Sequence, residues 1–164
     1  MLKRIRIEIT TVRYEVPGSF YGAIGEMPTP VLDALPADPA DVERTVLVTD
    51  ASYHDDGHRV SIRYTENADS GMEGTRTTVA FQKGEPDCVS VLRDGAVKGS
   101  LHLEQDRRYF GVYQTPMMPF ELCVLPRLVE NGMEKTGILR LDYTLELKGA
   151  QAQRTILTLR VLLS

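Results

Sequence analysis

Two glutamates stand at the ends of a tight bend, and carboxylates held close together can share a proton, a cation or a ligand. Glu66 ends an apolar face that runs along 60–66, and Glu73 ends a second one that runs along 73–81. A hairpin that matches these two faces places Glu66 opposite Glu73. Because facing like charges repel, the pair requires a cation or a shared proton.

Arg93 is the cation that we expect beside this pair. The next hairpin brings Thr75 and Thr77 alongside Arg93, and a planar guanidinium suits a carboxylate in partly desolvated surroundings. The predicted cluster, near one end of the fold, consists of Glu66, Glu73, Thr75 and Arg93.

The cluster has two main interpretations. As a structural network, it would fix the register of the strands and close one end of the fold. As a binding site, it would use Arg93 with Tyr113 or Tyr143 as the polar anchor of a ligand whose apolar body lies inside the fold. Acid/base catalysis by the two carboxylates is a weaker third reading, because proteins of this size bring acids together in many places. No residue is assigned a catalytic role.

The histidines are interpreted without a metal or a cofactor. His54 and His58 flank Asp56-Gly57, a pair typical of a hairpin turn, where aspartate accepts backbone hydrogen bonds. His102 stands between two leucines and therefore lies on the face opposite to them. The sequence also lacks a nucleophile elbow and a phosphate-binding glycine loop.

Alternating apolar and polar residues predict strands along almost the whole chain after residue 42. The connection at Asp94-Gly95 is predicted as a three-residue turn with a bulge rather than a two-residue turn. The predicted strands are 4–10, 43–53, 58–66, 73–82, 87–93, 96–104, 107–115, 118–128, 139–147 and 157–163.

Short strands joined by tight turns predict an all-β fold, an antiparallel meander. With almost no helix to cover a sheet edge, closing the sheet satisfies the edge hydrogen bonds, and the first and last strands are expected to meet. We therefore predict a barrel of eight to ten strands with less than about a tenth of the residues in helix. Residues 1–164 are expected to form one domain.

Six short motifs are spread along these predicted strands. They are Tyr64-Thr65-Glu66, Gly71-Met72-Glu73-Gly74-Thr75, Thr77-Thr78, Arg93-Asp94-Gly95, Tyr113-Gln114-Thr115-Pro116 and Leu141-Asp142-Tyr143. In order and spacing they resemble the YwiB-like family of bacterial proteins of unknown function, over roughly residues 43 to 163. The resemblance implies a calycin or lipocalin-like β-barrel and brings no activity with it. The chain departs from the family at Met117-Met118, where Tyr-Gly is usual, and in a longer segment before residue 43.

Residues 15–42 interrupt the alternation. They hold five of the nine prolines and three glycines, so they cannot form a central strand, and they exceed an ordinary hairpin loop. We predict a loop with one helical turn near 31–35 or 41–44. It is interpreted as a surface excursion, as a lid over one mouth or as an arm that reaches a second subunit, and the sequence leaves these alternatives open.

Composition limits the partners of this protein. Lys and Arg total 19 against 23 Asp and Glu, a net charge of −4, which disfavours nucleic acid and anionic membranes as partners. The first residues alternate charge with isoleucine, unlike a signal peptide, and no later segment resembles a membrane span. Cys88 and Cys123 lack the spacing of a metal site. A cytoplasmic location is expected, with both cysteines as small apolar side chains.

Three functions remain as hypotheses. The first is a non-catalytic barrel that binds a small amphiphilic or apolar ligand, as a monomer or a homodimer. The second is a protein-interaction or structural module whose barrel is filled with side chains, and the third is an enzyme that uses Glu66, Glu73 and Arg93. An interior cavity of a few hundred cubic ångströms would favour the first, and a packed interior the second.

Overall fold

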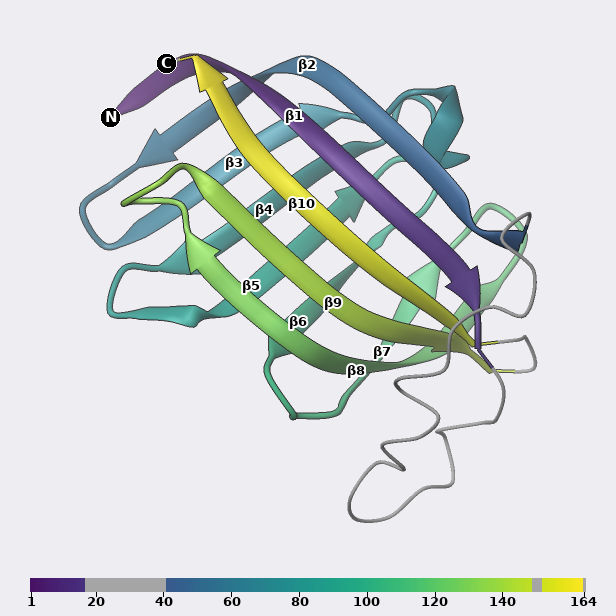
Figure 1. Cartoon of the computed structure of the whole chain (residues 1–164). Helices are drawn as coiled ribbons and strands as arrows, with labels where there is room; N and C mark the ends of the chain where they lie inside the picture. Colours follow the sequence, from purple (N-terminus) through teal and green to yellow (C-terminus); the bar gives the residue numbers. More distant parts are fainter. Residues whose placement is uncertain (17–40, 149–151, 164) are drawn as a thin grey trace.

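The structure is a computed structural model that describes residues 1–16, 41–148 and 152–163. In these residues, ten strands form one antiparallel sheet in the order β6-β5-β4-β3-β2-β1-β10-β9-β8-β7 (Figure 1). The strands are β1 (Leu2–Glu15), β2 (Glu43–Asp55), β3 (Arg59–Thr65), β4 (Arg76–Gln82), β5 (Glu85–Asp94), β6 (Gly99–Glu104), β7 (Tyr109–Gln114), β8 (Pro119–Gly132), β9 (Ile138–Leu147) and β10 (Gln153–Leu163). The predicted all-β meander is confirmed.

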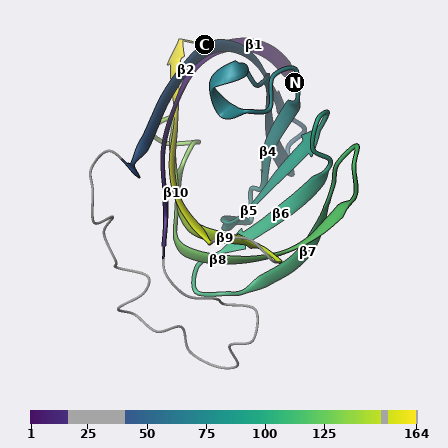
Figure 2. The same cartoon turned by 90° about the vertical axis from the view of Figure 1, so that its right-hand side faces the viewer.

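The sheet closes where its first and last strands meet. β1 and β10 pair from Arg6↔Leu163 to Glu15↔Gln153, as the sequence predicts. On the other side, the described residues form no ladder between β6 and β7, and two isolated bridges connect their ends, Lys98↔Gln114 and Glu104↔Arg107. The result is a nearly closed barrel, which Figure 2 shows from the side of the β3–β4 connection.

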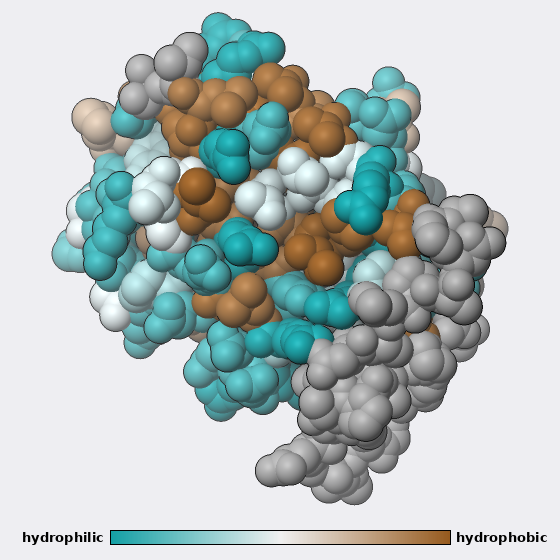
Figure 3. Space-filling view, viewed as in Figure 1, coloured by the Kyte–Doolittle hydropathy of each residue, from teal (hydrophilic) through white to brown (hydrophobic). Residues whose placement is uncertain are grey.

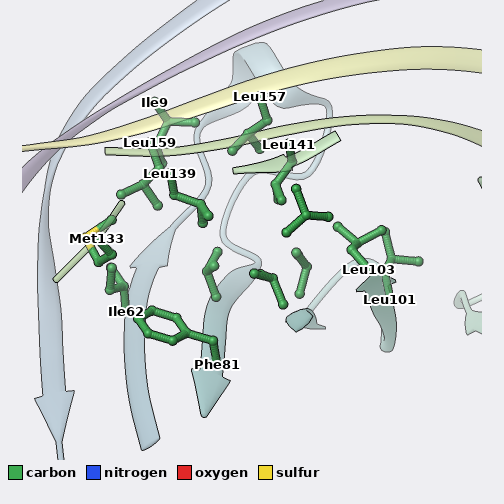
Figure 4. Close-up of a cluster of buried hydrophobic side chains, with 14 of the residues drawn as sticks. Ile9, Ile62, Phe81, Leu101, Leu103, Met133, Leu139, Leu141, Leu157 and Leu159 are labelled. Atoms are coloured by element: carbon green, nitrogen blue, oxygen red, sulfur yellow. The ribbon is translucent and has the colours of Figure 1, made fainter. Parts of the chain in front are cut away.

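Large apolar side chains from most of the strands fill the interior (Figure 4). Each strand alternates, so every second side chain points inward. Burying one leucine or isoleucine side chain stabilises the fold by about 1.5 to 3 kcal/mol. The largest fully buried residues are Ile7, Ile62, Leu101, Leu103, Leu122, Leu125, Leu139, Leu141 and Leu159. All of these except Leu125 belong to this interior cluster.

The β2–β3 hairpin confirms the turn that the sequence indicates. The carboxylate of Asp56 accepts hydrogen bonds from the backbone N–H groups of His58 and Arg59, at 2.8 and 2.7 Å. Gly57 has a φ of 91°, a conformation that favours glycine. The aspartates of this stretch therefore serve the turn.

The connection between β5 and β6 is longer than the predicted three-residue turn, which is wrong. The observed register is Arg93↔Gly99, so five residues separate the paired positions. Two contacts with Thr75 explain this: its Oγ1 accepts a hydrogen bond from Ala96 N–H at 3.1 Å, and a Cβ on Gly95 would lie 2.6 Å from its Cα. The connection thus packs against the β3–β4 turn.

The first strand also extends further than the sequence indicates. β1 continues to Glu15, and the next residue, Val16, is buried and donates its N–H to the carbonyl of Ala152 at 3.0 Å. The predicted proline-rich loop therefore begins after Val16. Its residues 17–40, with the predicted lid or arm, lie outside the described residues.

A second, smaller apolar cluster lies on the outer face of the barrel. It contains Tyr14, Val16, Cys123, Leu125 and Ala152. A charged group borders it: the guanidinium of Arg154 donates to both carboxylate oxygens of Asp142, at 2.9 and 2.6 Å, and to the hydroxyl of Tyr14 at 2.7 Å. These bonds tie β1, β9 and β10 together across the closure.

The two cysteines are expected to differ in reactivity toward a reagent such as DTNB. Cys123 is buried, and burial raises the pKa of its thiol to about 11. Cys88 is partly exposed, and burial, with the charge of Glu104, raises its pKa as well. At neutral pH the folded protein should react slowly at one thiol, and the second should react only after unfolding in urea. Two reactive thiols in the folded protein would contradict this.

Candidate functional site

Polar side chains gather inside the mouth of the barrel where β3 ends and β4 begins. Along β5, and along β3 and the residue after it, the inward positions are apolar at the centre and become tyrosine, glutamate or arginine toward this mouth, and β9 contributes Tyr143. The short 3-10 turn η2 (Ala68–Ser70) lies at the same mouth (Figure 2). Asn67 caps this turn, and Gly71 ends it with a φ of 76°.

Arg93 is the centre of this group. Its Nη1 donates a hydrogen bond to the hydroxyl of Tyr113 at 2.9 Å, whereas its Nε is buried without a partner. Among the described residues, no carboxylate lies within ion-pair distance of the guanidinium. Burial works to lower the pKa of Arg93, but the tyrosines around it and Glu66 outweigh burial and raise it.

Glu66 is the buried carboxylate of the mouth. Its Oε1 accepts a hydrogen bond from the hydroxyl of Thr77 at 2.9 Å. Burial, above all, raises the pKa of the neighbouring Tyr64, and the charge of Glu66 and a hydrogen bond to it raise it further. Tyr64 therefore stays protonated and can donate to Glu66. The hydroxyl groups of Thr77 and Tyr64 therefore contact this carboxylate, and the charge of Arg93 acts near it.

The predicted pairing of Glu66 with Glu73 is wrong. The β3–β4 ladder ends at Thr65↔Arg76, and beyond it Glu66 exchanges backbone hydrogen bonds with Thr75 and Gly74, at 2.8 and 3.1 Å. Glu73 is exposed in the turn. The turn is wider than a hairpin between 66 and 73 because it contains the capped turn η2. The facing carboxylates that an enzyme interpretation requires are therefore absent from this turn.

The other predicted site residues divide between the mouth and the turn. Tyr113 and Tyr143 are buried beside Arg93, and Tyr143 lines the same cavity as Arg93. Thr75 is fully buried, but its hydroxyl holds the β5–β6 connection through Ala96. Thr77 pairs with Arg93 across β4 and β5, as the sequence predicts.

The cavity at the mouth is small. It measures about 30 Å³, room for one or two water molecules. Its polar walls include Arg13, Tyr64, Glu66, Arg93 and Tyr143, and its apolar walls include Leu47 and Met72. This volume is far below the few hundred cubic ångströms expected of a ligand-holding interior, and buried apolar side chains form the interior cluster.

Two of these residues escaped the sequence analysis as members of the site. In the sequence, Tyr64 resembles the last apolar residue of a strand, and Thr77 is one of several threonines. In the structure, Tyr64 lies two residues before Glu66, and Thr77 pairs with Tyr64 on the neighbouring strand. A hydroxyl at the inward position next to a buried acid is the signal that could have found them.

The histidines do not contribute to the mouth. His54 and His58 are exposed at the β2–β3 hairpin, and the Nδ1 of His102 lies 2.9 Å from the hydroxyl of Ser90 on the outer face. Among the described residues, no group of His, Cys, Asp and Glu side chains is arranged to hold a metal ion. In the same residues, no helix is long and apolar enough to cross a membrane.

The described residues form a nearly closed barrel of ten strands, and one of its mouths carries an arginine, tyrosines and a glutamate. The protein is therefore a small all-β barrel protein with one polar end. A family model described as a domain of unknown function, DUF1934, matches residues 37–159. The chain therefore belongs to this family.

A solved structure supports the fold. The chain is similar to the ywiB protein from Bacillus subtilis, with 16% sequence identity and a TM-score of 0.66, over 98% of this chain and 92% of that one. At this identity the likeness shows the barrel fold alone. A search of curated proteins found no match.

Proposed function

We propose that this protein is a non-catalytic binding protein and that its Arg93 mouth takes the carboxylate head of a small amphiphile. The observation that carries the proposal is the state of the Arg93 guanidinium. A guanidinium has five N–H donors, and the described residues occupy one of them, through Tyr113. The buried Nε without a partner is costly unless another acceptor reaches it.

A carboxylate is the ligand group that suits these donors. It accepts two parallel hydrogen bonds from one guanidinium, in the bidentate geometry that strengthens both. Tyr143 lines the same cavity, and a tyrosine hydroxyl can donate to a further lone pair. Arg13 and Arg93 line the cavity together with Glu66, so its lining carries one net positive charge, and a head with a single negative charge fits better than a phosphate dianion.

The size of the cavity sets the orientation of the ligand. The interior is packed, so the head enters the mouth in place of the water that the cavity can hold. The apolar body then lies outward, along Leu47 and Met72. This arrangement keeps the proposed anchor residues and differs from the sequence expectation in the direction of the tail.

The proposal predicts binding that depends on Arg93. In calorimetric titrations, straight-chain carboxylates of six to ten carbons should bind at least about tenfold more tightly than the matching alcohols. Arg93→Gln should remove this preference, whereas Arg63→Gln, an exposed arginine on the outer face, should retain it. Equal binding of acids and alcohols, or a preference that survives Arg93→Gln, would overturn the proposal.

The second candidate is an interaction or structural module with a filled barrel. The packed interior favours it, since the polar mouth would then serve as a network that closes the barrel end. Absence of binding by all the carboxylates above, in protein of native stability, would favour this candidate. We also propose a cytoplasmic location, which the free thiols of Cys88 and Cys123 support.

A further inference from the structure

One long edge of the barrel wall has no strand partner. β2 pairs with β1 from Glu43 to His54, but with β3 only from Ser52 to Asp55. Among the described residues, nothing pairs with the backbone of 43–51 on the β3 side. An unpaired strand edge is a template for another strand.

The alternating direction of the backbone hydrogen bonds along β2 shows which backbone groups face this open side. The N–H of Asp55 donates to the carbonyl of Met1, toward β1, whereas the N–H of Asp56 donates to Arg59, toward β3. In a strand, these directions alternate from residue to residue. The backbone groups of the even-numbered residues therefore point into the open side, and these residues are Arg44, Val46, Val48 and Asp50.

The side chains along this edge offer little protection against association. Val46 is 57% exposed and Val48 is 42% exposed, and both lie on the outer face. Apolar side chains gather along the upper edge of the face in Figure 3, where β1 and β2 run in Figure 1. Exposed edge strands usually carry a lysine, a proline or a bulge that prevents pairing, and 45–49 contain none of these.

The sequence of the open edge is self-complementary. Residues 44–50 read Arg-Thr-Val-Leu-Val-Thr-Asp, which is the same in both directions except that its two ends carry opposite charges. Two copies placed antiparallel about Leu47 therefore match throughout. Val46 faces the partner's Val48, Thr45 faces the partner's Thr49, and Arg44 faces the partner's Asp50.

The hydrogen-bond phase fits the same arrangement. With the two-fold axis at Leu47, the facing pairs Val46 with Val48 and Arg44 with Asp50 are pairs whose backbone groups all point into the interface. A shift by one residue would bring groups that point toward β1 into the interface. The symmetric sequence, the opposite charges of its two ends and the direction of the backbone hydrogen bonds therefore select one register.

We propose that this protein forms a homodimer through antiparallel pairing of β2 with β2 of a second copy. The sheet then continues from one barrel into the next, in a two-fold symmetric contact of the kind most common in oligomers. The four valines form its apolar centre, and an ion pair closes each end. Asp50 already contacts Arg4, and its other oxygen lies 3.2 Å from Arg6, so the partner's Arg44 would complete a charged group with Asp50 at its centre.

Sedimentation of the full chain tests the proposal. The wild-type protein should sediment at twice the chain mass of 18.3 kDa, with a monomer appearing on dilution. Val46→Pro should weaken the dimer at least tenfold and leave the monomer folded, because the N–H that proline lacks faces the open edge. Val112→Pro is the matched control: Val112 is an exposed valine on β7, at the other end of the sheet, and should leave the dimer unchanged.

A charge exchange tests the register itself. Arg44→Asp places two acids at each end of the contact, and Asp50→Arg places two arginines there, so each variant should be monomeric alone. An equimolar mixture should form a heterodimer, because both ion pairs are then restored, and native mass spectrometry would identify it by mass. Circular dichroism checks the fold of Asp50→Arg, which also loses its contacts with Arg4 and Arg6.

Three results would overturn the proposal. They are a wild-type monomer at the highest soluble concentration, a dimer that Val46→Pro leaves intact, and folded charge variants that do not combine. A monomer would leave the open edge to an extended segment of another protein.

Discussion

Replacing Arg154 by methionine is expected to lower the free energy of unfolding by about 3 to 5 kcal/mol. The side chains of Arg154 and Asp142 are only 11% and 12% exposed, and both carboxylate oxygens are bonded to the guanidinium. Methionine keeps most of the apolar stem but removes every donor. Asp142 would then remain buried without its cation, and the hydroxyl of Tyr14 would lose its partner.

Urea unfolding of Arg154→Met measures this loss, with Arg160→Met as the control. Arg160 lies on the same strand and the same face, but it is exposed, so its replacement should cost less than about 0.5 kcal/mol. Adding Asp142→Asn to Arg154→Met should recover part of the loss, because the buried negative charge disappears. If Arg154→Met were no more destabilising than Arg160→Met, the pair would not stabilise the barrel closure.

Arg93→Ala is expected to destabilise the protein by about 2 to 4 kcal/mol. It removes the positive charge near the buried Glu66, the hydrogen bond to Tyr113 and the volume of a side chain at the barrel mouth. In a double-mutant cycle, Glu66→Gln should recover part of the loss, because the two charges interact across the cavity.

Glu73→Gln is the control that the structure itself provides for this cycle. Glu73 lies in the same turn as Glu66 and is exposed, so its effect should add to that of Arg93→Ala within about 0.5 kcal/mol. Coupling of Arg93 with Glu73, and additivity with Glu66, would contradict the geometry of the mouth. The chain has no tryptophan, so urea unfolding cannot be followed by tryptophan fluorescence. Circular dichroism measures the unfolding instead.

The architecture of this protein follows from its alternating pattern. Leu139, Leu141 and Tyr143 alternate with polar residues along a strand, and such a pattern leaves one buried and one outer face whatever the tertiary contacts are. The order of strands and the meeting of β1 with β10 follow as well, since tight turns join most neighbours and unpaired edges favour closure.

The sequence also placed Arg93 beside Thr77. This part of the site could be predicted because it depends on a single hairpin register, β4 with β5, that two alternating stretches define. Whether the mouth binds a ligand stays a prediction.

Contacts between turns were decided only by the tertiary structure. Glu73 lies outside the site because a capped 3-10 turn widens the bend after Thr65. The β5–β6 connection is longer than predicted because the N–H of Ala96 bonds to the hydroxyl of Thr75. The Asp142–Arg154–Tyr14 group likewise joins residues from three strands. Alternation has a period of two residues and specifies which face a side chain takes, so the sequence by itself determined the strands, their order and their inward faces. It carries no information on how far a loop spreads or which distant polar groups meet across strands, and these depend on packing and hydrogen bonding in three dimensions.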